Sequence, residues 1–185
     1  QLILISSLLL CRIIGFSQPS NDNCENALPV TINVDLNCTS LVSGTLLGAT
    51  ASPQSVASCS GSEDDDVWFS FVATNSTHYI ELSNIVGNTT SIYHSVWTGT
   101  CPSLTLYSNS CSYSSLSAVH GLTIGTTYFI RVYSSITGGA PNTTFDVCIK
   151  TPPAVSNDEC SNPVSVAINP DMNCNLLTSG TIQYA

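Results

Sequence analysis

The chain carries very little positive charge. Its 185 residues include three Lys and Arg against twelve Asp and Glu, so the formal net charge is −9 at pH 7. A surface of this kind repels the phosphates of nucleic acids and of anionic lipids. We therefore expect neither nucleic acid nor an anionic membrane as a partner.

Motifs for metal and catalytic chemistry are also lacking. The sequence contains no C-x-x-C pair, no G-x-S-x-G elbow and no H-E-x-x-H helix, which argues against zinc and redox centres and against common hydrolase sites. The only imidazoles belong to His78, His94 and His120, so a Ser, His and Asp triad would have to use one of them. We expect no catalytic residue, and the chain is predicted not to be an enzyme.

Long hydrophobic runs are missing except at the start. Residues 1–10 are almost all apolar but too few to span a bilayer, and the small residues Gly15 and Ser17 follow at positions that suit signal-peptidase cleavage. This pattern predicts a signal peptide over residues 1–17, secretion of the remainder, and no membrane insertion after cleavage. A lipid anchor on Cys11 is the alternative, although the leucines before it are larger than such a site prefers.

Cysteine, by contrast, is plentiful. Eight cysteines follow the predicted signal peptide, and an even number in an exported chain indicates disulfides. They are Cys24, Cys38, Cys59, Cys101, Cys111, Cys148, Cys160 and Cys174. Cys101 and Cys111 flank one predicted strand and could close a local loop.

Two pairings are open for the other four cysteines of the first 151 residues. One joins Cys24 to Cys148 and Cys38 to Cys59, because a bridge between the two ends closes the longest loop and constrains the unfolded chain most. The other joins Cys24 to Cys38, a spacing that recurs later in the chain. Each bridge would stabilise the fold by roughly 2 to 4 kcal/mol.

The clearest secondary-structure signal lies in residues 64–73, DDDVWFSFVA. Val67, Phe69 and Phe71 fall on one face of an extended segment while Trp68 falls on the other. This alternation predicts a core strand, and the acidic residues before it would discourage pairing with other molecules.

Short alternating segments of this kind, separated by Gly, Asn, Ser and Pro, recur along the chain without any sustained helical period. We expect strands over residues 28–34, 41–49, 67–73, 79–85, 92–98, 104–108, 116–119, 127–133 and 144–150. About nine strands in this length predict an all-β fold, an antiparallel two-sheet sandwich locked by disulfides.

The sequence repeats itself. Residues 21–49 align without gaps with residues 157–185, and 15 of the 29 positions are identical, which indicates tandem copies of one unit. The predicted organisation is a signal peptide, a sandwich repeat over residues 18–151, a Pro-rich linker over residues 152–156, and the truncated start of a second repeat over residues 157–185. Neighbouring repeats are then partners of one another.

Five segments carry a family resemblance. They are NDNC (21–24), DDDVWFSFVAT (64–74), IYHSVWTGTC (92–101), GLTIGTTYFIRVY (121–133) and FDVCIKTPP (145–153). The chain resembles the tandem β-sandwich repeats of large secreted Bacteroidetes proteins, related to pre-peptidase C-terminal-type and CUB-like domains. The resemblance implies a jelly-roll sandwich, export by type IX secretion, and service as a surface adhesin or as an accessory module of a secreted hydrolase.

Four consecutive acidic residues form the candidate metal site. Glu63, Asp64, Asp65 and Asp66 place four carboxylates on a predicted loop, and calcium takes six to eight oxygen ligands from such groups. Calcium is therefore the one candidate cofactor. The alternative is a solvated lead-in to the core strand, because the spacing lacks the pattern of an EF-hand loop.

Three aromatic residues form the candidate ligand site. Trp68, Tyr93 and Trp97 could make an exposed platform on which the apolar faces of sugar rings stack. The alternative places these rings in the core or at an edge.

Two functions follow from these readings. The first is a secreted or cell-surface, non-catalytic adhesion module that binds glycans or other surface polymers through repeated weak contacts. The second is an accessory domain of a secreted protease or glycoside hydrolase whose catalytic domain lies elsewhere in the protein.

Overall fold

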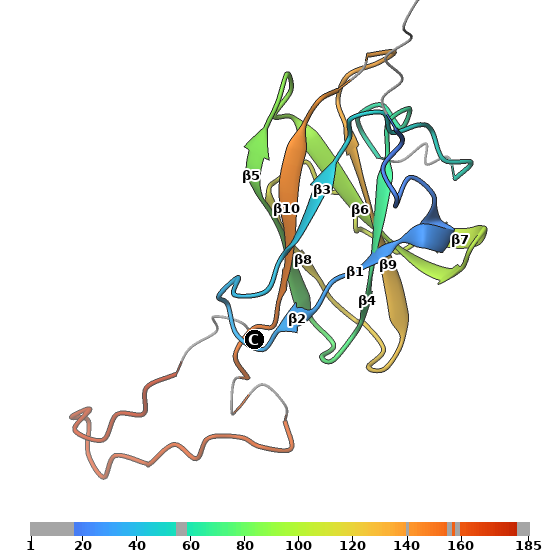
Figure 1. The fold of residues 1–185 in the computed structure, drawn as a ribbon. Helices are drawn as coiled ribbons and strands as arrows, with labels where there is room; N and C mark the ends of the chain where they lie inside the picture. Colours follow the sequence, from blue (N-terminus) through green and yellow to red (C-terminus); the bar gives the residue numbers. More distant parts are fainter. Residues whose placement is uncertain (1–16, 55–58, 140, 155–156, 158–159, 181–185) are drawn as a thin grey trace, which may run out of the picture.

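The structure, a computed structural model, describes residues 17–54, 59–139, 141–154, 157 and 160–180. Within these residues the chain forms two packed β-sheets with almost no helix (Figure 1). The predicted all-β sandwich is confirmed. The predicted signal peptide falls outside the described residues except for Ser17.

Each sheet has five strands. The first has the order β1-β4-β9-β6-β7, and the second has the order β2-β10-β5-β8, with β3 also pairing with β10. The elements are η1 (Cys24–Asn26), β1 (Leu28–Pro29), β2 (Ile32–Asn33), β3 (Val42–Thr45), β4 (Val67–Val72), β5 (His78–Val86), β6 (Ile92–Thr100), β7 (Ser103–Leu106), β8 (Leu116–Val119), β9 (Thr127–Ser134) and β10 (Thr144–Lys150).

The prediction of wholly antiparallel sheets is wrong in one place in each sheet. β1 runs parallel to β4, with Leu28 opposite Phe69, and β2 runs parallel to β10, with Ile32 opposite Ile149. The strand predicted over residues 28–34 is therefore two short strands in different sheets, because the chain steps from one sheet to the other without reversing. The remaining named strand pairs are antiparallel.

The core lies between the sheets, on the face that the alternation predicted. Val67, Phe69 and Phe71 of β4 are buried in it, and the ring of Phe69 meets that of Phe145 on β10 edge-on, with centroids 5.9 Å apart. Gly44 of β3 lies over both rings, since a Cβ there would come within 2.7 Å of Phe69 and 2.8 Å of Phe145. The two sheets therefore meet too closely at this point for any side chain.

The outer face of the first sheet is buried as well. Cys24 of η1, Trp68 of β4 and Trp97 of β6 form a second small core there, together with Leu104. The backbone of Trp68 donates to the carbonyl of Asn21 at 2.8 Å. The segment before β1 therefore covers this face, which leaves Trp68 beneath it.

All six candidate cysteines are bridged, but none of the predicted pairings is right. The bridges are Cys24–Cys101, Cys38–Cys148 and Cys59–Cys111. The predicted Cys24–Cys38 pair cannot form because η1 lies against the first sheet while the loop after β2 lies beside the second. The Cys24–Cys148 prediction fails in the same way, because Cys148 lies on β10 of the second sheet. The predicted Cys101–Cys111 and Cys38–Cys59 pairs are replaced by the bridges that Cys24, Cys59 and Cys148 form with these cysteines.

Residues 160–180 contain no strand or helix and extend away from the sandwich (Figure 1). Cys160 and Cys174 are exposed and unpaired. Among the residues that the structure describes, no helix is long and apolar enough to cross a membrane.

Candidate functional site

A buried ion pair occupies the outer face of the first sheet. Arg131 on β9 is fully buried, its Nε donates to Oδ2 of Asp66 at 2.8 Å, and its Nη1 lies 3.2 Å from Oε2 of Glu63. Its guanidinium carbon lies 5.6 Å from the ring centroid of Trp68 and 5.9 Å from that of Trp97. The Arg131 guanidinium, enclosed by carboxylates and aromatic rings, holds the loop before β4 against the sheet.

The carboxylates predicted to bind calcium face separate partners. Glu63 and Asp66 lie against Arg131, Asp65 accepts the backbone N–H of Ser134 at 2.9 Å, and Asp64 accepts that of Gly138 at 2.6 Å. Among the described residues no three acidic, His or Cys side chains are grouped so that they could hold a metal ion. Calcium at Glu63, Asp64, Asp65 and Asp66 stays a prediction, and this geometry gives it no support.

Burial changes the acidity of two of these carboxyls. It raises the pKa of Asp65 to about 6, against the hydrogen bonds from Ser134, which lower it. Burial also raises the pKa of Asp66, while Arg131 and Ser52 oppose that rise. These carboxyls are therefore parts of the scaffold, not solvated loop charges.

The predicted aromatic platform is wrong for its two tryptophans. Trp68 is 0% exposed and Trp97 is 3% exposed, so neither can receive a ligand ring. Their indole N–H groups are also bound internally, to Ser52 Oγ at 2.8 Å and Ser95 Oγ at 2.9 Å. Only Tyr93 of the three predicted residues is partly exposed.

Tyr93 leads to a different site. Its ring stacks on Tyr133, with centroids 5.8 Å apart, and meets Tyr113 edge-on at 6.0 Å. Tyr113 is 74% exposed. The row of rings thus runs from the buried face of the sheet to the surface, where Tyr113 ends it.

An open pocket of about 380 Å³ lies beside Tyr113, where the loop after β7 meets the loop before β4. Its lining residues are Ser60, Leu106, Asn109, Cys111 and Tyr113. This set combines an exposed phenol ring with an amide and a hydroxyl, which can donate and accept hydrogen bonds. We call it the Tyr113 pocket.

Several contacts fix the walls of the Tyr113 pocket. The Cys59–Cys111 bridge joins its two loops, the hydroxyl of Tyr133 donates to the carbonyl of Ser60 at 3.0 Å, and Ser112 exchanges backbone hydrogen bonds with His94 of β6 at 2.8 and 2.9 Å. Tyr113 follows Ser112 directly. A preorganised pocket loses little entropy when a ligand binds.

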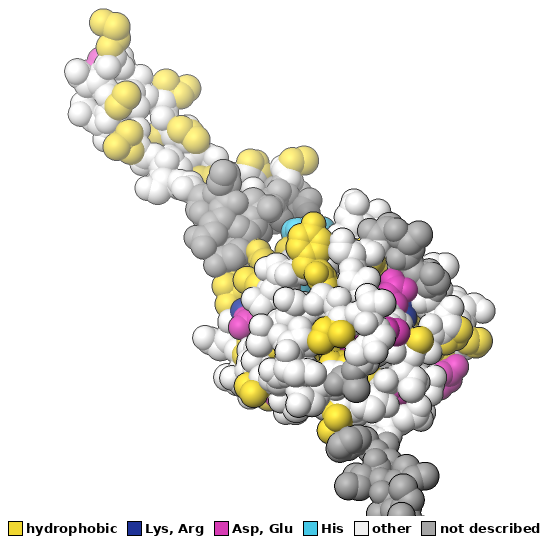
Figure 2. All heavy atoms as spheres, turned by 90° about the horizontal axis from the view of Figure 1, so that it is seen from above, with side chains coloured by type: hydrophobic (Ala, Val, Ile, Leu, Met, Phe, Trp, Pro, Cys, Tyr) yellow, Lys and Arg dark blue, Asp and Glu magenta, His cyan; other side chains and the backbone are white. Residues whose placement is uncertain are grey.

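Charge is sparse around the sandwich surface. On the face shown in Figure 2 most of the surface is neither acidic nor basic, and the lining of the Tyr113 pocket includes no Asp, Glu, Lys or Arg. Because the whole chain is strongly acidic, an anionic ligand is disfavoured, and the pocket itself supplies no charged side chain to pair with an ionic ligand.

A second open pocket, of about 370 Å³, lies beside β1 and β2. It is lined mainly by aliphatic and threonine side chains, among them Ile32, Val72 and Thr127, and its one aromatic residue, Phe71, is buried in the core. It offers no exposed ring for stacking.

His94 and His78 are not placed as members of a hydrolytic triad. His94 Nε2 lies 2.6 Å from the hydroxyl of Ser117, but Nδ1 has no hydrogen-bond partner, and burial lowers the pKa of His94 to about 4. A triad needs a carboxylate on that second nitrogen and access for substrate. His78 instead accepts the backbone N–H groups of Thr74 and Asn75, at 3.1 and 3.2 Å.

A family described as galactose binding domain-like, in its type IX secretion-associated form, matches residues 20–147. The chain belongs to this family. No curated protein matches it.

Membership in this galactose-binding-domain-like family agrees with a non-catalytic binding module. The type IX secretion association of the family and the three disulfide bridges together indicate an extracellular protein. The pre-peptidase-type, CUB-like and tandem-array assignments are narrower than this match and stay predictions. The sequence did not single out Tyr113, because the pocket beside it lies between two loops that the Cys59–Cys111 bridge joins, and spacing alone could not give that pairing.

Proposed function

We propose that this galactose-binding-domain-like module binds neutral glycans outside the cell through the Tyr113 pocket. The observation that carries the proposal is an exposed ring, 74% accessible, beside the amide of Asn109 in a pocket whose lining includes no Asp, Glu, Lys or Arg. Sugar rings have apolar faces that stack on aromatic rings and hydroxyls that bond to amides. The family assignment supports the same class of ligand.

A single pocket of this size supports weak binding. Repetition of such modules along one protein would multiply weak contacts into a firm attachment, which suits an adhesin at a cell surface. The same binding would suit an accessory domain of a secreted protease or glycoside hydrolase. A catalytic domain within the same protein would favour the accessory role.

A glycan array on residues 18–185 tests the proposal. We expect binding to a subset of neutral glycans and a loss of at least about tenfold in affinity for Tyr113→Ala, equal to about 1.4 kcal/mol. The matched control is Ile124→Ala, which removes a side chain that is 66% exposed in the turn before β9 and should bind as the native chain does. An array without binding, or equal binding by Tyr113→Ala, would refute the proposal.

A further inference from the structure

Residues 21–45, which we call the strap, close the sandwich by pairing with both sheets. β1 pairs with β4 of the first sheet, and β2 and β3 pair with β10 of the second. The Cys24–Cys101 and Cys38–Cys148 bridges attach the strap once to each sheet. Its two cysteines therefore bond to cysteines 77 and 110 residues away and not to each other.

Residues 157–180, which we call the tail, repeat the sequence of the strap. Asn157, Val166 and Asn169 occupy the positions of Asn21, Val30 and Asn33, and Cys160 and Cys174 occupy those of Cys24 and Cys38. Asn21, Val30 and Asn33 of the strap are all buried. The repeat thus preserves the residues by which the strap contacts the sheets.

The tail also repeats the local geometry of the strap. In the strap, Asn33 Nδ2 donates to the carbonyl of Ser40 at 2.8 Å and Oδ1 accepts the N–H of Ser40 at 2.8 Å. In the tail, Asn169 makes the same pair of bonds with Leu176, at 3.0 and 2.7 Å. Residue 176 is the counterpart of residue 40.

A second turn is reproduced within this loop. Asp35 accepts the backbone N–H of Asn37 at 2.8 Å and its side-chain amide at 3.1 Å. Asp171 accepts the corresponding groups of Asn173 at 2.9 and 3.1 Å. The loop therefore forms from its own residues, without a sheet beside it.

The described residues of the tail differ from the strap in having no sheets packed against them. Val30 is 5% exposed, whereas Val166 is 70% exposed. Gly44 lies against the rings of Phe69 and Phe145, whereas a Cβ on Gly180 would meet nothing within 4 Å.

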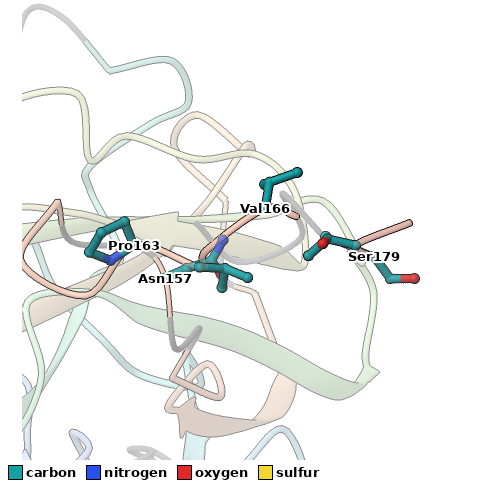
Figure 3. Close-up of a pocket in the computed structure, with 7 residues that line it drawn as sticks. Asn157, Pro163, Val166 and Ser179 are labelled. Atoms are coloured by element: carbon teal, nitrogen blue, oxygen red, sulfur yellow. The ribbon is translucent and has the colours of Figure 1, made fainter. Parts of the chain in front are cut away.

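A hollow of about 350 Å³ lies between the two arms of the tail, lined by Asn157, Pro163, Val164, Val166, Thr178, Ser179 and Gly180 (Figure 3). Its lining includes the residues equivalent to Asn21, Val30 and Gly44. In the sandwich the space beside Gly44 is filled by aromatic rings of β4 and β10.

We propose that the tail is a preformed strap that closes a second sandwich of this same fold. Its partner is the pair of sheets that such a sandwich presents, with rings equivalent to Phe69 and Phe145 entering the hollow. Cys160 and Cys174 bridge to the cysteines equivalent to Cys101 and Cys148. This inference is independent of glycan binding.

The test removes the two cysteines of the strap, so that the cysteines to which they are bridged become available to the tail of the same chain. In residues 18–185 carrying Cys24→Ser and Cys38→Ser, Cys101 and Cys148 lose their native bridges and the tail competes for the same sheets. We expect Cys101–Cys160 and Cys148–Cys174 bridges, within one molecule or between two, as the dominant pairs in peptide mapping of the oxidised protein by mass spectrometry. A Cys160–Cys174 bridge, a Cys101–Cys148 bridge or four free thiols would overturn the proposal.

A second variant tests the proposal even if the Cys24→Ser, Cys38→Ser protein does not fold. Replacing residues 21–45 with the sequence of residues 157–181 keeps both strap cysteines in place and leaves the native strap unavailable. We expect this chimera to form all three native bridges and to keep a urea midpoint close to that of the native chain. Loss of the native bridges would show that the tail sequence cannot act as a strap, and would overturn the proposal.

Discussion

Replacing Arg131 with methionine should be the most damaging change to a single charged residue in this chain. The methionine fills much of the same space but leaves Asp66, which is 0% exposed, without its cation. It also removes the charge that lies 5.6 to 5.9 Å from the rings of Trp68, Trp97 and Tyr133. Both losses act on the buried outer face of the first sheet.

The magnitude follows from the burial of the pair. Breaking a buried ion pair by removing one partner destabilises a protein by about 3 to 5 kcal/mol, because the remaining charge is left uncompensated. A domain of this size is stable by about 5 to 15 kcal/mol. Replacing both Arg131 and Asp66 by apolar residues should therefore be less harmful than replacing Arg131 alone, since neither member of this pair is then left buried without its partner.

Urea unfolding with the bridges intact measures this loss, and tryptophan fluorescence is a direct probe because both tryptophans contact Arg131. The matched control is Lys150→Met, which breaks the ion pair between Lys150 and Glu81, whose side chains are 12% and 31% exposed. We expect this control to lower the free energy of unfolding by about 1 kcal/mol or less. Equal losses in Arg131→Met and Lys150→Met would refute the reasoning.

Two further predictions concern the core. Burial lowers the pKa of His94 to about 4, so between pH 6.5 and 4 the unfolded chain binds one more proton than the folded chain. As the pH falls through that range, the free energy of unfolding of the native protein should therefore drop by on the order of 3 kcal/mol relative to that of His94→Gln. Urea unfolding at each pH measures both, and parallel stability curves would contradict this prediction. Gly44→Ala should lower the free energy of unfolding by about 1 to 3 kcal/mol through overpacking. Gly180→Ala, at the equivalent open position of the tail, should leave the free energy of unfolding unchanged. Equal effects of the two substitutions in calorimetry would show that the close approach at Gly44 is not a constraint.

The strands of the fold could be predicted from the sequence because alternation is a local property. Val67, Phe69 and Phe71 are buried as their spacing requires, and β8 and β10 begin and end at the predicted residues. The crossing of the chain between β1 and β2 was missed, because two-residue strands leave no periodic signal. The cysteine pairs depend on which segments cover which sheet, and sequence spacing does not encode that.

The sequence predicted Tyr93, which lies beside the Tyr113 pocket, but it did not predict Tyr113 itself as a ligand-binding residue. Tyr93 is grouped with Trp68 and Trp97 from the sequence because all three are aromatic, yet the segment before β1 packs over the two tryptophans, which are buried. Tyr113 lies two residues after Cys111, in a serine-rich segment without strand periodicity. The pocket beside it lies where the Cys59–Cys111 bridge joins the two loops.

The measurement that tests the central claim most directly is amide chemical-shift mapping of residues 18–185 during titration with the neutral oligosaccharide that binds best on the array. The account predicts shifts concentrated around Ser60, Asn109 and Tyr113, with the second pocket near Val72 and Thr127 unaffected. Shifts confined to that second pocket, or none at saturating sugar, would contradict it.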